Sequence, residues 1–144
     1  MAVTAIPEGF HSVTPSLVVK GAAKLIDFVK EAFGAEETVR MPAPNGEIMH
    51  AEVRIGDSVV MMNDAMHQSP TISSLLLYVV DVDRVYQRAL KAGATSLSEP
   101  ADMFWGDRMA QVKDEFGNHW SIATHVEDVP PQELRKRAEA AMRQ

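Results

Sequence analysis

The chain contains no cysteine among its 144 residues. That absence excludes disulfide bridges, thiolate metal sites and a cysteine nucleophile. Aromatic residues are also few, at 6% of the chain. The longest apolar runs, such as residues 75–80, are far shorter than the roughly 20 residues that a membrane-spanning helix needs. We therefore expect no membrane partner.

Basic charge is scarce as well, because the formal net charge is −6. Nucleic-acid binding needs a clustered cationic face, and the basic residues gather only once, at residues 135–137. Residues 1–10 lack the basic and apolar regions of a signal peptide. These features predict a cytoplasmic protein without a nucleic-acid partner, and the net acidity favours the approach of cationic ligands.

The chain does contain an internal repeat, in which one supersecondary unit occurs twice. Residues 17–35 read LVVKGAAKLIDFVKEAFGA, and residues 77–94 read LYVVDVDRVYQRALKAGA. Each copy is an apolar strand, a polar corner and an amphipathic helix closed by Gly-Ala, followed by segments of alternating polarity. A spacing of about 60 residues predicts two βαβββ modules. The expected fold class is α+β in a single domain, 1–144, with module one at about 10–64, module two at about 73–125 and a C-terminal helix at about 130–143.

Periodicity and turn residues predict the individual elements. In module one they are a strand from 10 or 11 to 19, a helix over 22–33, a strand over 38–41, and a hairpin of 48–55 with 58–63. In module two they are a strand over 73–80, a helix over 82–92 with Asp81 as its N-cap, and strands over 95–98, 108–113 and 118–124.

Four segments, GAAKLIDFVKEAFGAE, IMHAEVRIGDSVVMMND, FWGDR and DEFGNHWSIATHVEDV, resemble the glyoxalase / bleomycin resistance / extradiol dioxygenase superfamily, the vicinal oxygen chelate proteins. The match is closest to its PhnB-like, glyoxalase-like branch. The resemblance implies curved mixed sheets around a cavity, helices on the convex side, and a homodimer. Because the superfamily includes isomerases, dioxygenases, antibiotic-modifying enzymes and passive drug binders, the fold alone does not choose the chemistry.

The resemblance also implies where a metal would bind, on the first and last strand of each module. Those positions fall on Thr14, Met61, Ser74 and Ser121. A hydroxyl is a poor sole ligand, and a thioether prefers soft metals. We therefore predict no metal ligand and no cofactor, with a divalent metal ion as the alternative.

That alternative rests on His50 and Glu52, which lie two apart in a predicted strand and so point to the same side. They are the predicted catalytic pair of a metal-dependent enzyme of the glyoxalase, lyase/isomerase or dioxygenase type, as base or as metal ligands, with His119 as a conceivable third group. Alternatively, the two side chains simply hydrogen-bond across neighbouring strands.

The favoured interpretation is a metal-independent binding protein that holds a small organic ligand in the cavity. Its predicted ligand-binding residues are Thr14, Met61, Tyr78, Trp105, Arg108 and Ser121. Trp105 would stack on a planar ligand, and Arg108 would clamp a carboxylate or phosphate. Alternatively, Trp105 closes the cavity and Arg108 pairs with Asp107, Asp114 or Glu115. Whether the chain is an enzyme stays open at this point.

Overall fold

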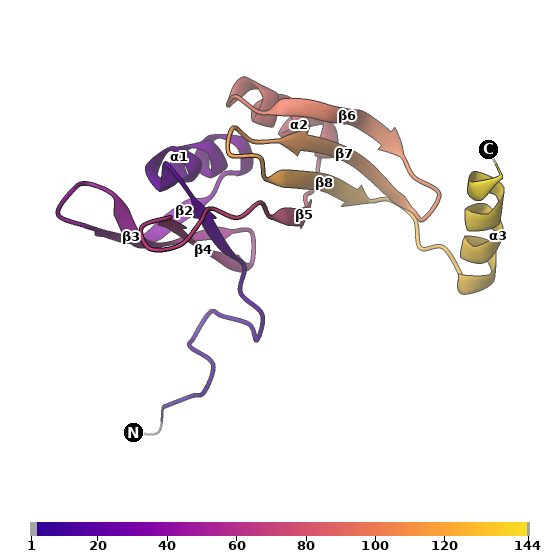
Figure 1. Cartoon of the computed structure of the whole chain (residues 1–144). Coiled ribbons are helices and arrows are strands. Elements are labelled where there is room, and N and C mark those ends of the chain that lie inside the picture. The colour runs from indigo at the N-terminus through magenta and orange to yellow at the C-terminus, as the bar shows by residue number, and fades with distance from the viewer. Residues whose placement is uncertain (1–2, 144) are drawn as a thin grey trace. The chain divides into compact units, whose positions relative to one another are not determined.

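The structure is a computed structural model that describes residues 3–143. The chain divides into two compact units, residues 1–73 and 74–144. Each unit is a four-stranded mixed sheet with a helix between its first and second strands (Figure 1). The predicted α+β class with two βαβββ modules and a C-terminal helix is confirmed.

The first unit comprises β1 (Ser16–Val19), α1 (Ala22–Phe33), β2 (Glu36–Pro42), β3 (Ile48–Ile55) and β4 (Ser58–Asp64). Its strand order is β1-β4-β3-β2, in which β1 is parallel to β4 and the other pairs are antiparallel. The helix buries its apolar stripe against one face of the sheet, and Leu25, Ile26 and Val29 are each 0% exposed. It ends as predicted at Gly34, whose positive φ of 68° suits a residue without a side chain.

The second unit comprises β5 (Ser74–Tyr78), α2 (Val82–Lys91), β6 (Thr95–Asp102), β7 (Asp107–Lys113), β8 (His119–His125) and α3 (Pro131–Met142). The order β5-β8-β7-β6 repeats that of the first sheet, with β5 parallel to β8. Asp81 is the N-cap of α2, as predicted, because its carboxylate accepts a hydrogen bond from the backbone N–H of Arg84.

In each unit, the strand that comes last along the chain, β4 or β8, carries a side chain that binds the N-terminus of the helix. At the end of β4, Asp64 accepts hydrogen bonds from the backbone N–H groups of Gly21 and Ala22. At the end of β8, the Thr124 hydroxyl accepts from the backbone N–H of Val82. Helix N-termini leave such donors without partners inside the helix, so these two side chains fix each helix to its sheet.

Two strand boundaries differ from the sequence-based expectations by more than two residues. The first strand begins at Ser16, so the predicted start at residue 10 or 11 is wrong. Pro15 has no N–H to donate to a sheet, and Val13 is 85% exposed. The strand predicted over 95–98 is longer, since β6 continues to Asp102.

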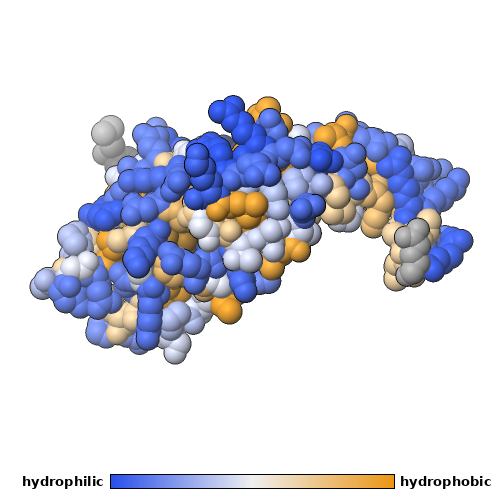
Figure 2. Space-filling view, turned by 90° about the horizontal axis from the view of Figure 1, so that it is seen from above, coloured by the Kyte–Doolittle hydropathy of each residue, from blue (hydrophilic) through white to orange (hydrophobic). Residues whose placement is uncertain are grey.

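The terminal helix α3 forms where it was predicted, but it has no buried residue. Arg137 anchors it through a bidentate ion pair with Glu127 and a hydrogen bond to the Phe104 carbonyl. On the face seen in Figure 2, hydrophilic residues predominate and hydrophobic ones form small separate patches. No helix within residues 3–143 is long and apolar enough to cross a bilayer.

Candidate functional site

Each sheet has one face that carries its helix and one that does not, here called the helix-free face. In the second sheet, Trp120 and Ile122 of β8 are buried beside α2, and Thr124 contacts the helix N-terminus. Side chains alternate along a strand, so the odd-numbered residues of β8 lie on the helix-free face. The hairpin register places Asp107, Met109 and Gln111 of β7 opposite them.

The helix-free face of the second sheet contains a hydrogen-bonded cluster centred on a buried carboxylate. Asp107 is 3% exposed. Its Oδ2 accepts hydrogen bonds from the Tyr78 hydroxyl at 2.8 Å and from Trp105 Nε1 at 3.1 Å. Its Oδ1 lies 2.8 Å from His125 Nδ1. We call these four residues the Asp107 cluster.

Burial and hydrogen bonding act in opposite directions on Asp107. Burial raises the pKa of its carboxyl, but hydrogen bonds from His125, Tyr78 and Trp105 outweigh that effect and hold the pKa below its usual value. The same contact raises the pKa of the Tyr78 phenol, because ionisation would place two anions side by side. The cluster therefore contains an ionised aspartate and a neutral tyrosine at neutral pH.

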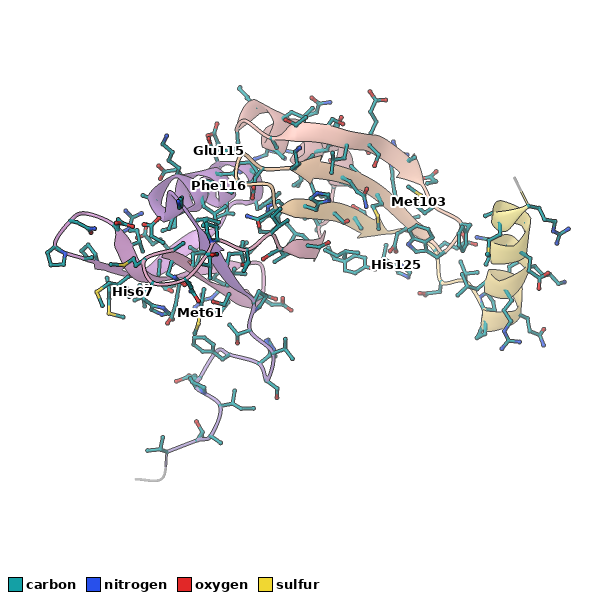
Figure 3. The ribbon with its side chains drawn as sticks, viewed as in Figure 1. Met61, His67, Met103, Glu115, Phe116 and His125 are labelled. Carbon is teal, nitrogen blue, oxygen red and sulfur yellow. The ribbon has the colours of Figure 1, made fainter. Side chains whose placement is uncertain are left out.

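His125 is the last residue of β8, and Figure 3 shows it at the end of that strand from which the chain continues to α3. Its side chain is 51% exposed, and its Nε2 lies 2.7 Å from Oδ1 of Asp128, whose side chain is fully exposed. Hydrogen bonds to Asp128 and then to Asp107 raise the pKa of the imidazole. His125 thus joins a buried carboxylate to an exposed one.

The two aromatic rings of the cluster are held in place by different contacts. Tyr78 is 58% exposed although its hydroxyl is fixed by Asp107. The ring of Trp105 packs edge-to-face against Phe104, with ring centroids 5.0 Å apart. An aromatic ring held in place loses little conformational entropy when a flat molecule binds to it.

Two other predicted ligand-binding residues of this unit, Arg108 and Ser121, hydrogen-bond to residues outside the Asp107 cluster. The Arg108 guanidinium forms ion pairs with Asp83 of α2 and Asp102 of β6, so it lies on the α2 side of the sheet, away from Tyr78 and Trp105. Ser121 is on the helix-free face, where its hydroxyl accepts a hydrogen bond from Gln111 Nε2 at 3.2 Å. The structure therefore brings Tyr78 and Trp105 together and leaves Arg108 apart.

In the first sheet, the predicted catalytic pair shares the helix-free face. His50 Nε2 lies 2.8 Å from Glu52 Oε2, and their side chains are 30% and 20% exposed. Met61 of β4 pairs with Glu52, and Figure 3 shows its side chain projecting from the side of the sheet opposite α1. Thr14 is half-buried and precedes β1.

The first unit also has a cavity of about 410 Å³ beside the end of β4. Its lining residues are Ala43, Pro44, Met49, Asn63, Asp64, Met66, His67 and Gln68. Both oxygens of Asp64 already accept backbone hydrogen bonds, from Gly21 and Ala22 on one side and from Ile48 on the other. This carboxylate is therefore a structural group rather than a ligand-binding one.

Metal binding needs several ligands around one point. Within the part of the chain that the structure describes, no group of three or more His, Asp or Glu side chains is placed to hold an ion. Asp107 and Asp128 lie on opposite nitrogens of the His125 imidazole, so the two carboxylates do not converge. The cluster is suited to positioning a histidine and two aromatic rings.

Reasoning from the sequence missed the central role of Asp107. The information was present, because the turn at residues 114–117 sets the register of the hairpin that follows. Pairing Lys113 with His119 and counting outward places Asp107 opposite His125. The sequence predicted only that His125 shares a face with Ser121.

Comparison with known proteins agrees with the fold. The sequence-family model of the "Glyoxalase/Bleomycin resistance protein/Dioxygenase superfamily" matches residues 9–122 of this chain. "Uncharacterized protein Mb0911c" from Mycobacterium bovis is 43% identical over 136 residues, which cover 86% of this chain and 90% of that protein.

Solved structures show the same architecture. TioX from Micromonospora sp. ML1 superposes with a TM-score of 0.69 and 26% identity, over 81% of this chain and 99% of that one. A Bacillus cereus protein described as "Putative 3-demethylubiquinone-9 3-methyltransferase, PhnB protein" has a TM-score of 0.65 and 16% identity, over 79% and 99% of the two chains. From the extent of the family match and the shared fold, the chain belongs to the glyoxalase/bleomycin resistance protein/dioxygenase superfamily.

Proposed function

We propose that this chain binds a small, partly planar organic ligand on the helix-free face of its second sheet, at Tyr78 and Trp105. The observation that carries the proposal is the anchoring of both aromatic side chains to one buried carboxylate, Asp107. A site whose side chains are already ordered loses less entropy on binding than one that must order them. The binding needs no cofactor.

The charges around the cluster favour neutral or cationic ligands. Asp107 and Asp128 are anionic, and a protonated His125 offsets one of them. Cations are also attracted to the faces of tyrosine and tryptophan rings. The net charge of −6 acts in the same direction during encounter.

Isothermal titration calorimetry with two planar probes tests the proposal, using neutral 5-nitrobenzisoxazole and cationic ethidium. Replacing Tyr78 or Trp105 by Leu should weaken binding by about 2- to 10-fold each, since one aromatic contact contributes roughly 0.5–1.5 kcal/mol. Tyr86→Phe is the matched control, because Tyr86 is 4% exposed and its hydroxyl bonds to Ser96. The proposal fails if neither probe binds, or if the control loses as much affinity as the two Leu variants.

A second candidate is the metal-dependent enzyme, favoured by the 2.8 Å contact between His50 and Glu52. An imidazole and a carboxylate are suitable ligands or bases. His50 and Glu52 supply only two groups, however, whereas a catalytic zinc site usually has three protein ligands. Manganese or zinc binding by the wild type that disappears in His50→Ala would support this candidate over the first.

We also propose that the chain forms a homodimer, acts in the cytoplasm and belongs to the PhnB-like branch. The similar fold of the Bacillus cereus protein supports the branch, and the absence of cysteine suits a reducing compartment. Exposed apolar side chains such as Leu76, at 49%, offer surface for self-association. Sedimentation equilibrium tests the dimer, which predicts twice the mass of one 15.8 kDa chain.

A further inference from the structure

We infer that His125 transfers protons at the proposed ligand site and that Asp107 is the residue that positions it. This inference rests on the proposed binding of a planar molecule at Tyr78 and Trp105. The substrate class is a planar organic molecule with an acidic C–H or N–H bond, and the reaction class is proton transfer.

The first support is the fixed orientation of the imidazole. Asp107 is buried and accepts hydrogen bonds on both oxygens, so its carboxylate has little freedom to turn. Its Oδ1 lies 2.8 Å from His125 Nδ1. An ionised carboxylate accepts only, so Nδ1 carries a hydrogen. The contact with Asp128 places a hydrogen on Nε2 as well, so a lone pair is available on Nε2 only after Asp128 has turned away and that proton has left.

The second support is the contrast between the two carboxylates that flank the ring. Asp107 is buried, whereas the side chain of Asp128 is fully exposed and solvated. Rotation of Asp128 away from Nε2 would cost little, because water would replace the hydrogen bond. Nε2 would then be open to solvent and to an approaching ligand, with the ring still held by Asp107. A base oriented by a third, buried group is the arrangement of many acid–base sites.

The third support is the protonation behaviour of the ring. The groups that face it are Asp107 from β7, Asp128 from the segment after β8, and the neutral phenol of Tyr78, which shares Asp107 from β5. The two carboxylates raise the pKa of His125, with Asp128 the larger influence. A deprotonated His125 is therefore a stronger base than an unperturbed histidine.

A step that the site could perform on a probe is the ring opening of 5-nitrobenzisoxazole. The Nε2 lone pair removes the proton from C3, and the electron pair of that C–H bond completes the C≡N triple bond. The N–O bond breaks, and its electron pair stays on oxygen to give 2-cyano-4-nitrophenolate. The imidazolium then releases its proton to water, so no oxidant or reductant is involved.

The experiment measures kcat/KM for this reaction from pH 5 to 9 through the absorbance of the phenolate. His125→Gln should lower kcat/KM by at least about 100-fold, the usual contribution of a positioned base. His11→Gln is the matched control, because His11 is an exposed histidine of the first unit, and it should leave the rate unchanged.

Substitution of the two carboxylates should change the rate at pH 7 in opposite directions. Asp128→Asn should raise kcat/KM and move the inflection of the pH profile downward, because it uncovers Nε2 and removes an anion. Asp107→Asn should also move the inflection downward but lower kcat more than it raises KM. The amide oxygen can still accept from Tyr78 and Trp105, whereas the amide NH2 cannot accept from His125 Nδ1, so the ring loses its orientation. A thermal unfolding scan of each variant separates these effects from loss of fold.

Calorimetry with the same probe distinguishes failure of the inference from failure of the proposed function. If the wild type binds neither 5-nitrobenzisoxazole nor ethidium, the proposed function is wrong. If 5-nitrobenzisoxazole binds but His125→Gln reacts as fast as wild type, or the Asp128→Asn profile does not move, the inference about His125 is overturned.

Discussion

Replacing Asp64 by Ala removes a single carboxylate that holds three parts of the first unit together. Its oxygens accept hydrogen bonds from the backbone N–H groups of Gly21, Ala22 and Ile48, at 2.7, 2.9 and 2.7 Å. These donors begin α1 and β3, while Asp64 itself ends β4 and is 6% exposed. The substitution leaves all three donors without their acceptor.

The expected loss follows from these contacts. A hydrogen bond to a charged group contributes about 1.5–3 kcal/mol, and the loss of a helix N-cap costs about 1 kcal/mol. Gly21 is only half-buried, so water partly replaces its bond. We expect Asp64→Ala to lower the free energy of unfolding by about 3–4 kcal/mol, and Asp64→Asn by about 2 kcal/mol, because the amide keeps one acceptor oxygen.

Urea unfolding followed by far-ultraviolet circular dichroism measures this loss, since both tryptophans, Trp105 and Trp120, lie in the other unit. Asp57→Ala is the control, because Asp57 is exposed and accepts a hydrogen bond from the neighbouring Ser58 hydroxyl, and it should change stability by less than about 0.5 kcal/mol. A loss below about 1 kcal/mol for Asp64→Ala would refute the reasoning.

The pH dependence gives a second check on Asp64. Burial raises its pKa, but the three backbone hydrogen bonds outweigh burial and keep the pKa below the usual value. A carboxyl whose pKa is lowered on folding stabilises the protein above its unfolded pKa, near 3.9, and that stabilisation is lost as the pH falls through the folded pKa. The stability gap between wild type and Asp64→Ala should therefore shrink below about pH 4.

Three further predictions concern the second unit. Gly106→Ala should destabilise the protein by at least about 2 kcal/mol in urea unfolding, because φ is +102° and a Cβ would collide with the Glu127 carbonyl oxygen; unchanged stability would contradict the close packing. Arg108→Ala should cost less than about 1 kcal/mol and leave the affinity for 5-nitrobenzisoxazole unchanged, because its partners lie on the α2 side; a loss of affinity above 5-fold would place it at the site instead. The NMR titration midpoint of His125 should lie above 6.5 and fall in Asp128→Asn, and an unchanged midpoint would show that the contact with Asp128 is absent in solution.

The sequence predicted the fold well because its signals are local and repeated. The apolar spacing of Leu25, Ile26 and Val29 sets the buried face of α1, and Gly34 and Asp81 mark helix ends through their own backbone and side-chain chemistry. The start of β1 was predicted too early, because alternation of polarity continues through Val13 although Pro15 has no N–H to donate to a sheet.

The site was harder to predict because it depends on contacts between distant positions. Tyr78 and Asp107 are 29 residues apart, and His125 follows Asp107 by 18. No short motif joins them, and each has an unremarkable local context. Strand parity did place His125 and Ser121 on one face, and the hairpin register would have placed Asp107 opposite His125. Neither could show that Tyr78 and Trp105 would meet that carboxylate, or that Arg108 would turn toward Asp83.

The central claim is that a planar ligand binds at Trp105 beside the Asp107–His125 pair, and the two indole N–H signals of a ¹⁵N-labelled sample report on it directly. Trp105 donates its indole N–H to Asp107, while Trp120 is 1% exposed and donates to Asp114. On titration with 5-nitrobenzisoxazole, the Trp105 indole signal should shift in a saturable way and the Trp120 signal should stay in place. Saturable binding that moves neither indole signal, as occupation of the cavity near Met49 and His67 would produce, would contradict the account.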